Sequence, residues 1–411
     1  GTDSLTIGGA HHAQVTYDAS GADAGEVDLD GTVITYSGLE PVTNTGTADD
    51  VVFNLSADDD DAVFEPDGSA VRLRSQDAPP TFEQTTFNLP TNSLTINGGD
   101  GEDSLAVELD VNAPGMDLTI NSEMIRITAG RSLSVRDLSL IADASDSGLL
   151  GIDEILANSE ARIKVDPGTA LSGRDVTLRA TATTDTNSDG FAIGGFKIAI
   201  VTGSAEAEVH VESAQVSTSN NLTIESIARI NTVANGNGDG ASDDTQDIAV
   251  AITVVTSSAI ARVTGDSEIA VGSDFDLAAT NEANVRTTAD GTLGGPGAAG
   301  GSIATTVAIT KSRAYLEHSV RVDSGEARIE AVSDHDLATS AKSSAGGATS
   351  NSTGSPQSLT NNNAQTSDGP VDVAAALAFT ELNTETQAYS TTDDRVTAGP
   401  SGSVDFLPPV L

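Results

Sequence analysis

Five segments in the last two thirds of the chain repeat one pattern, and this internal repeat constrains the fold more than any other feature. The anchoring residue of each segment is an alanine, and these anchors are Ala161, Ala207, Ala261, Ala314 and Ala388. Their spacings are 46, 54, 53 and 74 residues. In the first four segments a second apolar anchor follows 15 to 17 residues later: Leu178, Ile224, Leu277 and Ile329. Constant offsets within a unit and variable lengths between units predict repeated strands joined by variable polar loops.

Short runs that alternate apolar residues with Ser, Thr or charged residues dominate the sequence and predict strands. Residues 93–96, 117–120 and 221–224 are examples, and such runs stop at Gly, Asp or Asn. Residues 148–159 carry apolar side chains at roughly helical spacing. For this segment a short helix and a capping turn are both open interpretations.

The chain has few side chains that could fill a thick core. Its 411 residues include no Cys, no Trp, 4 Tyr and 9 Phe. Small aliphatic residues suit the thin interior of a stacked β-solenoid, and an offset of about 16 residues fits one coil. On this basis a unit of about 53 residues makes three coils. The rival interpretation is a series of tandem β-sandwich domains. We predict an all-β fold that is mainly a parallel β-solenoid with polar loop insertions.

The N-terminal part has a different pattern. GTDSLTIGG at the start matches GEDSLAV from Gly101, so residues 1–112 are predicted to be one β module that ends in a GGxGxD-type turn. Residues 113–411 are predicted to be the solenoid repeat region. Within it, residues 340–370 form a low-complexity Ser, Thr, Asn and Gly stretch that predicts a flexible loop. Because the chain begins at Gly1, we interpret it as a piece of a longer protein.

The charge excludes several classes of partner. The formal net charge is −42, from 19 Lys plus Arg against 61 Asp plus Glu. Nothing neutralises phosphates, so no nucleic-acid partner is expected. An anionic membrane surface repels such a chain, and no apolar run is long enough for a transmembrane helix, so no membrane insertion is expected.

The sequence TYSGLEPVTNTGTADDVVFNL (residues 35–55), followed by SLTINGGDGEDSL (residues 93–105), resembles modules of giant secreted bacterial surface proteins. These proteins carry hemolysin-type calcium-binding repeats, and some belong to the filamentous-haemagglutinin-like adhesins. The repeat units from residue 159 onward are similar to repeats in the same proteins. The resemblance implies a right-handed parallel β-helix outside the cell or at its surface. It also implies a role in adhesion or in building a matrix or filament.

The predicted cofactor is calcium, from two kinds of motif. Residues 98–106 fit the nonapeptide GGxGxDxUx, in which Asp100 and Asp103 supply carboxylates. Calcium takes six to eight oxygen ligands, so one copy supplies half a site, and a plain β-turn is the alternative.

The second motif is DxNxDG, the first half of a calcium loop. Its candidate ligands, with those of the equivalent loop one unit later, are Asp185, Asn187, Asp189, Asn235, Asn237 and Asp239. The twelfth position is Phe196 in the first loop and Gln246 in the second, where a bidentate Glu is expected. Ordinary Asx-rich turns are therefore the alternative.

No catalytic motif is found in the sequence. The five His form no HExxH, and no GxSxG occurs. We therefore predict a non-enzymatic structural or adhesive protein that associates with itself, end to end or laterally, or with surface glycans. The alternatives are a β-helix polysaccharide lyase or hydrolase and a phage-type fibre.

Overall fold

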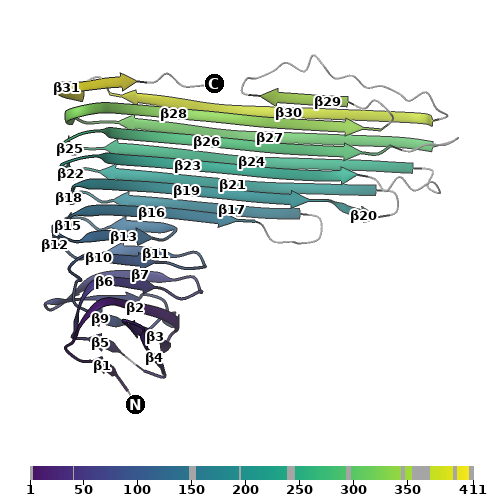
Figure 1. Cartoon of the computed structure of the whole chain (residues 1–411). Coiled ribbons are helices and arrows are strands. Elements are labelled where there is room, and N and C mark those ends of the chain that lie inside the picture. The colour runs from purple at the N-terminus through teal and green to yellow at the C-terminus, as the bar shows by residue number, and fades with distance from the viewer. Residues whose placement is uncertain are drawn as a thin grey trace.

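The computed structural model describes residues 3–39, 41–147, 154–193, 196–237, 246–292, 298–343, 348–353, 371–391 and 396–406. These residues form strands and turns and no helix, which confirms the all-β prediction. It follows that none of them forms a helix that could span a bilayer. The strands belong to two large, mainly parallel sheets, here called sheet A and sheet B (Figure 1).

Sheet A runs from the N-terminal to the C-terminal end of the described chain. Its strands, in spatial order, are β1 (Leu5–Ile7), β5 (Val42–Asn44), β9 (Thr85–Phe87), β8 (Ala70–Ser75), β7 (Asp61–Asp67), β11 (Ser104–Val107), β14 (Met124–Ile127), β17 (Glu154–Val165), β21 (Phe196–Glu212), β24 (Gln246–Thr264), β27 (Ala298–Leu316) and β30 (Val371–Ser390). The short β20 (Phe191–Ile193) pairs antiparallel with β21.

Sheet B has two rows of strands. In the first, here called the long row, the strands reach a length of 23 residues, and the second is called the short row. The long row comprises β2 (His11–Gly21), β3 (Ala24–Leu29), β4 (Thr32–Ser37), β6 (Thr47–Asn54), β10 (Ser93–Asn97), β13 (Asp117–Asn121), β16 (Asp137–Asp146), β19 (Asp175–Ser188), β23 (Leu222–Asn237), β26 (Phe275–Asp290), β28 (Val320–Lys342) and β29 (Ala348–Thr353). The short row comprises β12 (Val111–Ala113), β15 (Ser132–Val135), β18 (Ala170–Gly173), β22 (Gln215–Thr218), β25 (Glu268–Val271), the start of β28 and β31 (Val396–Phe406).

Each repeat unit makes one circuit of three strands. The chain passes through a short strand such as β18, leaves along a long strand of sheet B such as β19, and returns along sheet A in β21. The next unit lays β22, β23 and β24 on these three strands in parallel register. The expectation of three coils per unit is therefore wrong. The strands extend to 14–23 residues, so one circuit uses the whole unit.

The repeat alignment made from the sequence is largely confirmed by the strand register. Ala161 pairs with Ala207, and Ala314 pairs with both Ala261 and Ala388. The column Leu178, Ile224, Leu277, Ile329 is also paired throughout. One step is wrong by two residues, because Ala207 pairs with Ala259. A shift of two keeps the same residues on the inner face, so the side-chain pattern alone does not reveal it.

Neither interpretation of residues 148–159 holds for the part that is described. Residues 154–159 begin β17, which pairs with β21 over its whole length. Residues 148–153 lie outside the described part. The apolar spacing of the whole segment is compatible with a helix, but in residues 154–159 pairing with β21 satisfies the backbone in an extended conformation.

The N-terminal part differs in topology and in core composition. Two antiparallel meanders, β2–β3–β4 and β7–β8–β9, occur here. The buried aromatic rings gather around them in stacked or edge contacts: Tyr17, Phe53, Phe64, Phe82 and Phe87. Both sheets then continue across residue 112, because β10 pairs with β13 and β11 pairs with β14. Of the predicted loop 340–370, residues 348–353 form β29, and residues 344–347 and 354–370 lie outside the described part.

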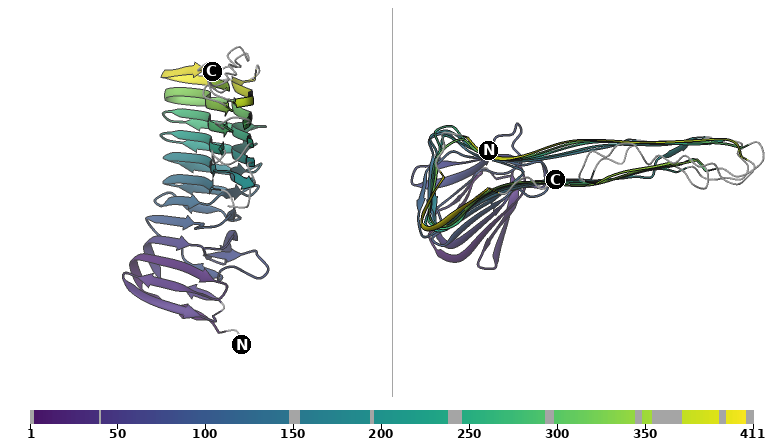
Figure 2. Two further views of the ribbon diagram at one scale, coloured as in Figure 1. Left: turned by 90° about the vertical axis from the view of Figure 1, so that its right-hand side faces the viewer. Right: turned by 90° about the horizontal axis from the view of Figure 1, so that it is seen from above.

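Seen from above, the strands outline a three-sided body at one end and a flat two-layered extension, here called the wing (Figure 2). The wing is formed by the ends of β19, β23, β26 and β28 and the starts of β21, β24, β27 and β30. Its apolar interior consists almost entirely of alanine: Ala199, Val201, Ala234, Ala249, Ala251, Ala289, Ala304, Ala341 and Ala378. Small side chains allow the two sheets to lie close together, which explains why so few aromatic residues suffice.

Buried threonines join the two layers of the wing. Thr253, Thr306 and Thr380 form one in-register column in sheet A, and Thr287 and Thr339 pair in sheet B. Their hydroxyl groups form one zigzag chain of hydrogen bonds, 2.6–2.7 Å between oxygens. The Thr-rich strands therefore supply a polar seam inside the wing as well as β-branched side chains suited to a sheet.

We expect Thr306→Val to lower the free energy of unfolding by about 1–3 kcal/mol, because it leaves the buried hydroxyls of Thr287 and Thr339 each without one partner. Valine keeps the branched shape, so packing changes little. Urea unfolding followed by circular dichroism measures the effect. Thr305→Val, on the outer face of the same strand, is the matched control and should change stability by less than about 0.5 kcal/mol. Equal effects of the two substitutions would contradict the role of the seam.

Candidate functional site

Three stacked turns near the start of the parallel region bring acidic residues together. They are residues 55–61, 97–104 and 121–124, each joining a strand of sheet B to one of sheet A. Backbone hydrogen bonds from Leu55 N–H to Asn97 O (2.9 Å) and from Gly98 N–H to Asn121 O (2.7 Å) hold them in register. Amide side chains stack beside them, since Asn97 donates to Asn54 and Asn121 donates to Asn97, both at 2.7 Å. We call these three turns the acidic turn stack.

Asp103 is the centre of the acidic turn stack and is completely buried. Its Oδ1 accepts the backbone N–H of Asp60 at 2.9 Å, and its own N–H donates to Glu123 Oε2 at 2.9 Å. Its Oδ2 is buried without a hydrogen-bond partner. Asp60 is also buried and accepts from the backbone and hydroxyl of Ser56. The motif residue Asp103 is therefore part of a buried carboxylate group and not of a plain exposed turn.

Two glycines of the motif are required because neighbouring atoms leave no room for a Cβ. A Cβ on Gly98 would lie 2.5 Å from Asp103 Oδ2. Gly99 has φ +116° and a Cβ there would lie 2.7 Å from the carbonyl oxygen of Ser56. The glycines thus let the middle turn lie directly on the carbonyl groups of the turn before it.

Burial is the main cause of the raised pKa values in the acidic turn stack. It raises the pKa of Asp103 to about 7, and repulsion from Glu123, Asp60 and Asp59 adds to the increase. Burial also raises the pKa of Asp60 and of Glu123 above their ordinary values. Such a group favours either protonation or a cation that neutralises it.

A hollow of about 430 Å³ lies beside the stack. Its acidic lining residues are Asp100, Glu102, Glu123, Asp146 and Glu160. Asp100 is exposed at this surface, whereas Asp103 lies beneath it. The two predicted ligands of the GGxGxD motif therefore occupy different environments.

The second predicted motif is not a loop. Asp185 and Asn187 belong to β19 and Asp189 follows it directly, all three exposed on one face. Neighbours two apart on an extended strand are roughly 6.6 Å apart, so their oxygens do not converge. Instead, Asn231 donates to Asp185 at 2.8 Å and Asn235 donates to Asp189 at 3.3 Å.

The equivalent residues one unit later behave in the same way. Asn235 and Asn237 are in β23, next to Asp189 and the end of β19. Asp239 lies outside the described residues. Asp185 and Asp189 each accept a hydrogen bond from an Asn of the neighbouring strand β23, so these described positions form a side-chain ladder and not a calcium-type turn.

Within the described ranges, no group of three or more His, Asp or Glu side chains is placed to hold a metal ion. The donors of the acidic turn stack are all oxygens, which is the chemistry calcium prefers. The unpartnered Oδ2 of Asp103 is the feature that fits a cation, while the full set of six to eight ligands is not assembled around it.

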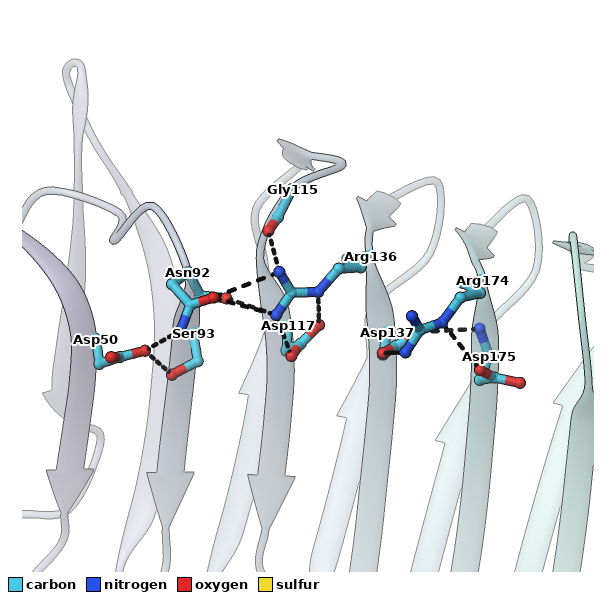
Figure 3. Close-up of polar contacts among 9 residues, drawn as sticks. All are labelled: Asp50, Asn92, Ser93, Gly115, Asp117, Arg136, Asp137, Arg174 and Asp175. Carbon is cyan, nitrogen blue, oxygen red and sulfur yellow. Dashed lines mark hydrogen bonds and ion pairs between the residues drawn. The ribbon is translucent and has the colours of Figure 1, made fainter.

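A second charged feature, missed from the sequence, lies where the long strands of sheet B begin (Figure 3). Asp117 opens β13, Asp137 opens β16 and Asp175 opens β19, one above the other, so like charges stack at the spacing of adjacent strands. Arg136 donates to Asp117 through Nε at 2.6 Å, and Arg174 lies between Asp137 and Asp175. The recurrent Arg-Asp dipeptides, 136–137 and 174–175, are the sequence signal that identifies this corner column.

We expect Arg136→Gln to lower the melting temperature at low salt by about 1 °C or more, because Asp117 and Asp137 then repel each other directly. The difference should shrink in high salt as the repulsion is screened. Arg321→Gln, which removes an arginine paired with Asp323 at an exposed position, serves as the control. A salt-independent loss, or an equal loss in the control, would argue against the corner column.

Comparison with known proteins gave no match: no family model, no curated protein and no solved structure is significantly similar to this chain.

Proposed function

We propose that this chain is a non-enzymatic structural or adhesive segment of a larger bacterial surface, matrix or filament protein, built as a right-handed parallel β-helix. The observation that carries the proposal is the strict register with which each unit lays its three strands on those of the previous unit. Parallel strands joined by crossovers within one sheet are right-handed in about 98 % of cases, which supports the handedness.

Such an assembly is suited to a mechanical role and not to a catalytic one. Each unit adds about 4.8 Å along the stack, and its backbone hydrogen bonds run along that direction. Side-chain ladders at the corners and in the wing reinforce the same contacts. The acidity and the resemblance noted above support an extracellular or cell-surface location as part of this proposal. Partners are copies of the chain itself or surface glycans.

Electron microscopy of the purified chain tests this proposal. We expect stiff, flat particles whose long edge matches the strand direction of the wing, with no activity on a panel of acidic and neutral polysaccharides. Compact particles without this flat extension, or depolymerisation of any polysaccharide in the panel, would overturn it.

We further propose that calcium binds at the acidic turn stack, with Asp103 and Glu123 as the residues that hold it. Chelation with EGTA is then expected to lower the melting temperature, and added CaCl₂ to restore it. Asp103→Asn should abolish the response, because it removes the buried charge that a cation neutralises. Asp189→Ala tests the other motif in the same assay. A melting temperature that does not respond to chelator or calcium in the wild-type chain would remove calcium from the proposal.

A further inference from the structure

The outer face of sheet A in the wing carries apolar side chains in register. One column is Ile198, Val250, Ile303 and Leu377, and a neighbouring column contains Ile200, Ile252 and Phe379. We define the apolar face as Ile198, Ile200, Val250, Ile252, Val254, Ile303, Val307, Ile309, Leu377 and Phe379. Exposed fractions reach 55 % for Leu377, 47 % for Ile309 and 44 % for Ile303. A contiguous apolar surface of this kind marks an interaction site.

The opposite face of the wing and of the strands that lead to it is charged. The outward acids of β16, β19, β23, β26 and β28 are Asp137, Asp143, Asp175, Asp185, Glu225, Asp276, Glu282, Asp290, Asp323, Glu326, Glu330, Asp334 and Asp336. The outward basic residues of these strands are Arg179, Arg229, Arg286, Arg321, Arg328 and Lys342. Acids exceed bases about twofold on sheet B, so two such faces repel each other.

Charges on the outer face of sheet A are balanced instead. The outward bases of β14 to β30 are Arg126, Arg162, Lys164, Arg262, Lys311 and Arg313, and the outward acids are Glu160, Glu206, Glu208, Glu212, Glu381 and Glu385. Many pair across strands, as Arg262 does with Glu208 at 2.6 Å. In a chain of net charge −42, another acidic molecule meets less repulsion on this face than on the outer face of sheet B.

The outer face of sheet A, in which the apolar face is continuous with the charged rows beside it, is large enough for a stable interface. Strands β21 and β24 pair over residues 196–212 of β21, and β27 and β30 continue the same face. At 3.3 Å per residue and 4.8 Å per strand, the flat area of these four strands is roughly 1,100 Å². A standard interface buries about 800 Å² per partner.

We propose that a second copy of this chain docks on the apolar face, sheet A against sheet A about a two-fold axis. A flat sheet matches another flat sheet at a spacing of about 10 Å, and the two-fold axis places apolar rows opposite apolar rows. The inference rests on the proposed structural role and specifies the surface through which copies associate laterally. Because the net charges repel, added salt strengthens this dimer while hydrophobic contact holds it together.

Sedimentation equilibrium of the wild-type chain tests the dimer. We expect a mass of twice 41.5 kDa, with a dissociation constant that falls as salt is added. Ile303→Glu places a carboxylate from each copy in the dry interface and should raise that constant at least about tenfold. Val332→Glu, on the outer face of β28 in sheet B, is the control and should leave it unchanged.

Single cysteines locate the contact, because the chain has none of its own. Ile303→Cys should form a disulfide or short bis-maleimide cross-link between copies, and Val332→Cys should not. A monomeric wild type, or cross-linking through position 332 in preference to 303, overturns the inference. Either result leaves the stiff flat particle seen by electron microscopy, and hence the proposed structural role, intact.

Discussion

Wild-type protein in EGTA is expected to lose stability as the pH rises from 4 to 7, and Asp103→Asn is expected to remove most of that loss. The folded-state pKa of Asp103 is about 7, against an ordinary value of 3.8. A group whose pKa is raised on folding contributes stability that is fully present below its unfolded pKa and is lost as pH rises through its folded pKa. The relevant window is therefore pH 4 to 7.

The size of this loss of stability is set by the difference between the folded-state pKa of Asp103 and its ordinary value. The rise in the pKa of Asp103 from 3.8 to about 7 corresponds to at most about 4 kcal/mol of unfolding free energy. Chemical unfolding at a series of pH values measures it. The Asn side chain keeps an oxygen for the N–H of Asp60 and carries no charge, so the stability of the Asp103→Asn variant should vary less between pH 4 and 7.

Two controls define the interpretation. Asp189→Ala removes an exposed acid from the end of β19 and should retain the wild-type pH profile. Saturating calcium should flatten the profile of the wild-type chain if the cation occupies the acidic turn stack. A pH profile of Asp103→Asn that overlays the wild type in EGTA would show that another group governs the titration.

Leu118→Ala is expected to cost about 2–5 kcal/mol of unfolding free energy, the largest loss we predict for a single side chain. Leu118 is completely buried in β13 and pairs with Leu94 in β10 and with Leu138 in β16. A stacked column offers few ways to close the cavity, because each neighbour is fixed by its own strand pairing.

Thr119→Ala is the matched control, one residue away on the outer face of the same strand. It should change stability by less than about 1 kcal/mol. Guanidinium unfolding followed by circular dichroism gives both values. A loss from Leu118→Ala no larger than the control would mean that the inner column does not carry the stability of the stack.

The sequence by itself determined that the chain consists of strands, that a unit repeats, and all but one of the anchor pairings between units. The alternation of apolar and polar residues specifies an inner face, so the pattern alone is enough to align Leu178, Ile224, Leu277 and Ile329. The scarcity of aromatic residues and the abundance of alanine indicated a thin core, and the wing interior has that composition. These properties follow from local periodicity and side-chain volume, and the sequence of each repeat unit contains both.

Only the tertiary structure decided how long each circuit is and what the polar residues do. Strand length depends on whether a neighbouring strand satisfies the backbone, so Asp185 and Asn187 became part of an extended ladder instead of a loop. The burial of Asp103 depends on the turn of residues 55–61 that lies 43 residues earlier. The balanced charge on the outer face of sheet A comes from strands that are distant in the sequence. The register between units brings these strands onto one face, and no single unit encodes that register.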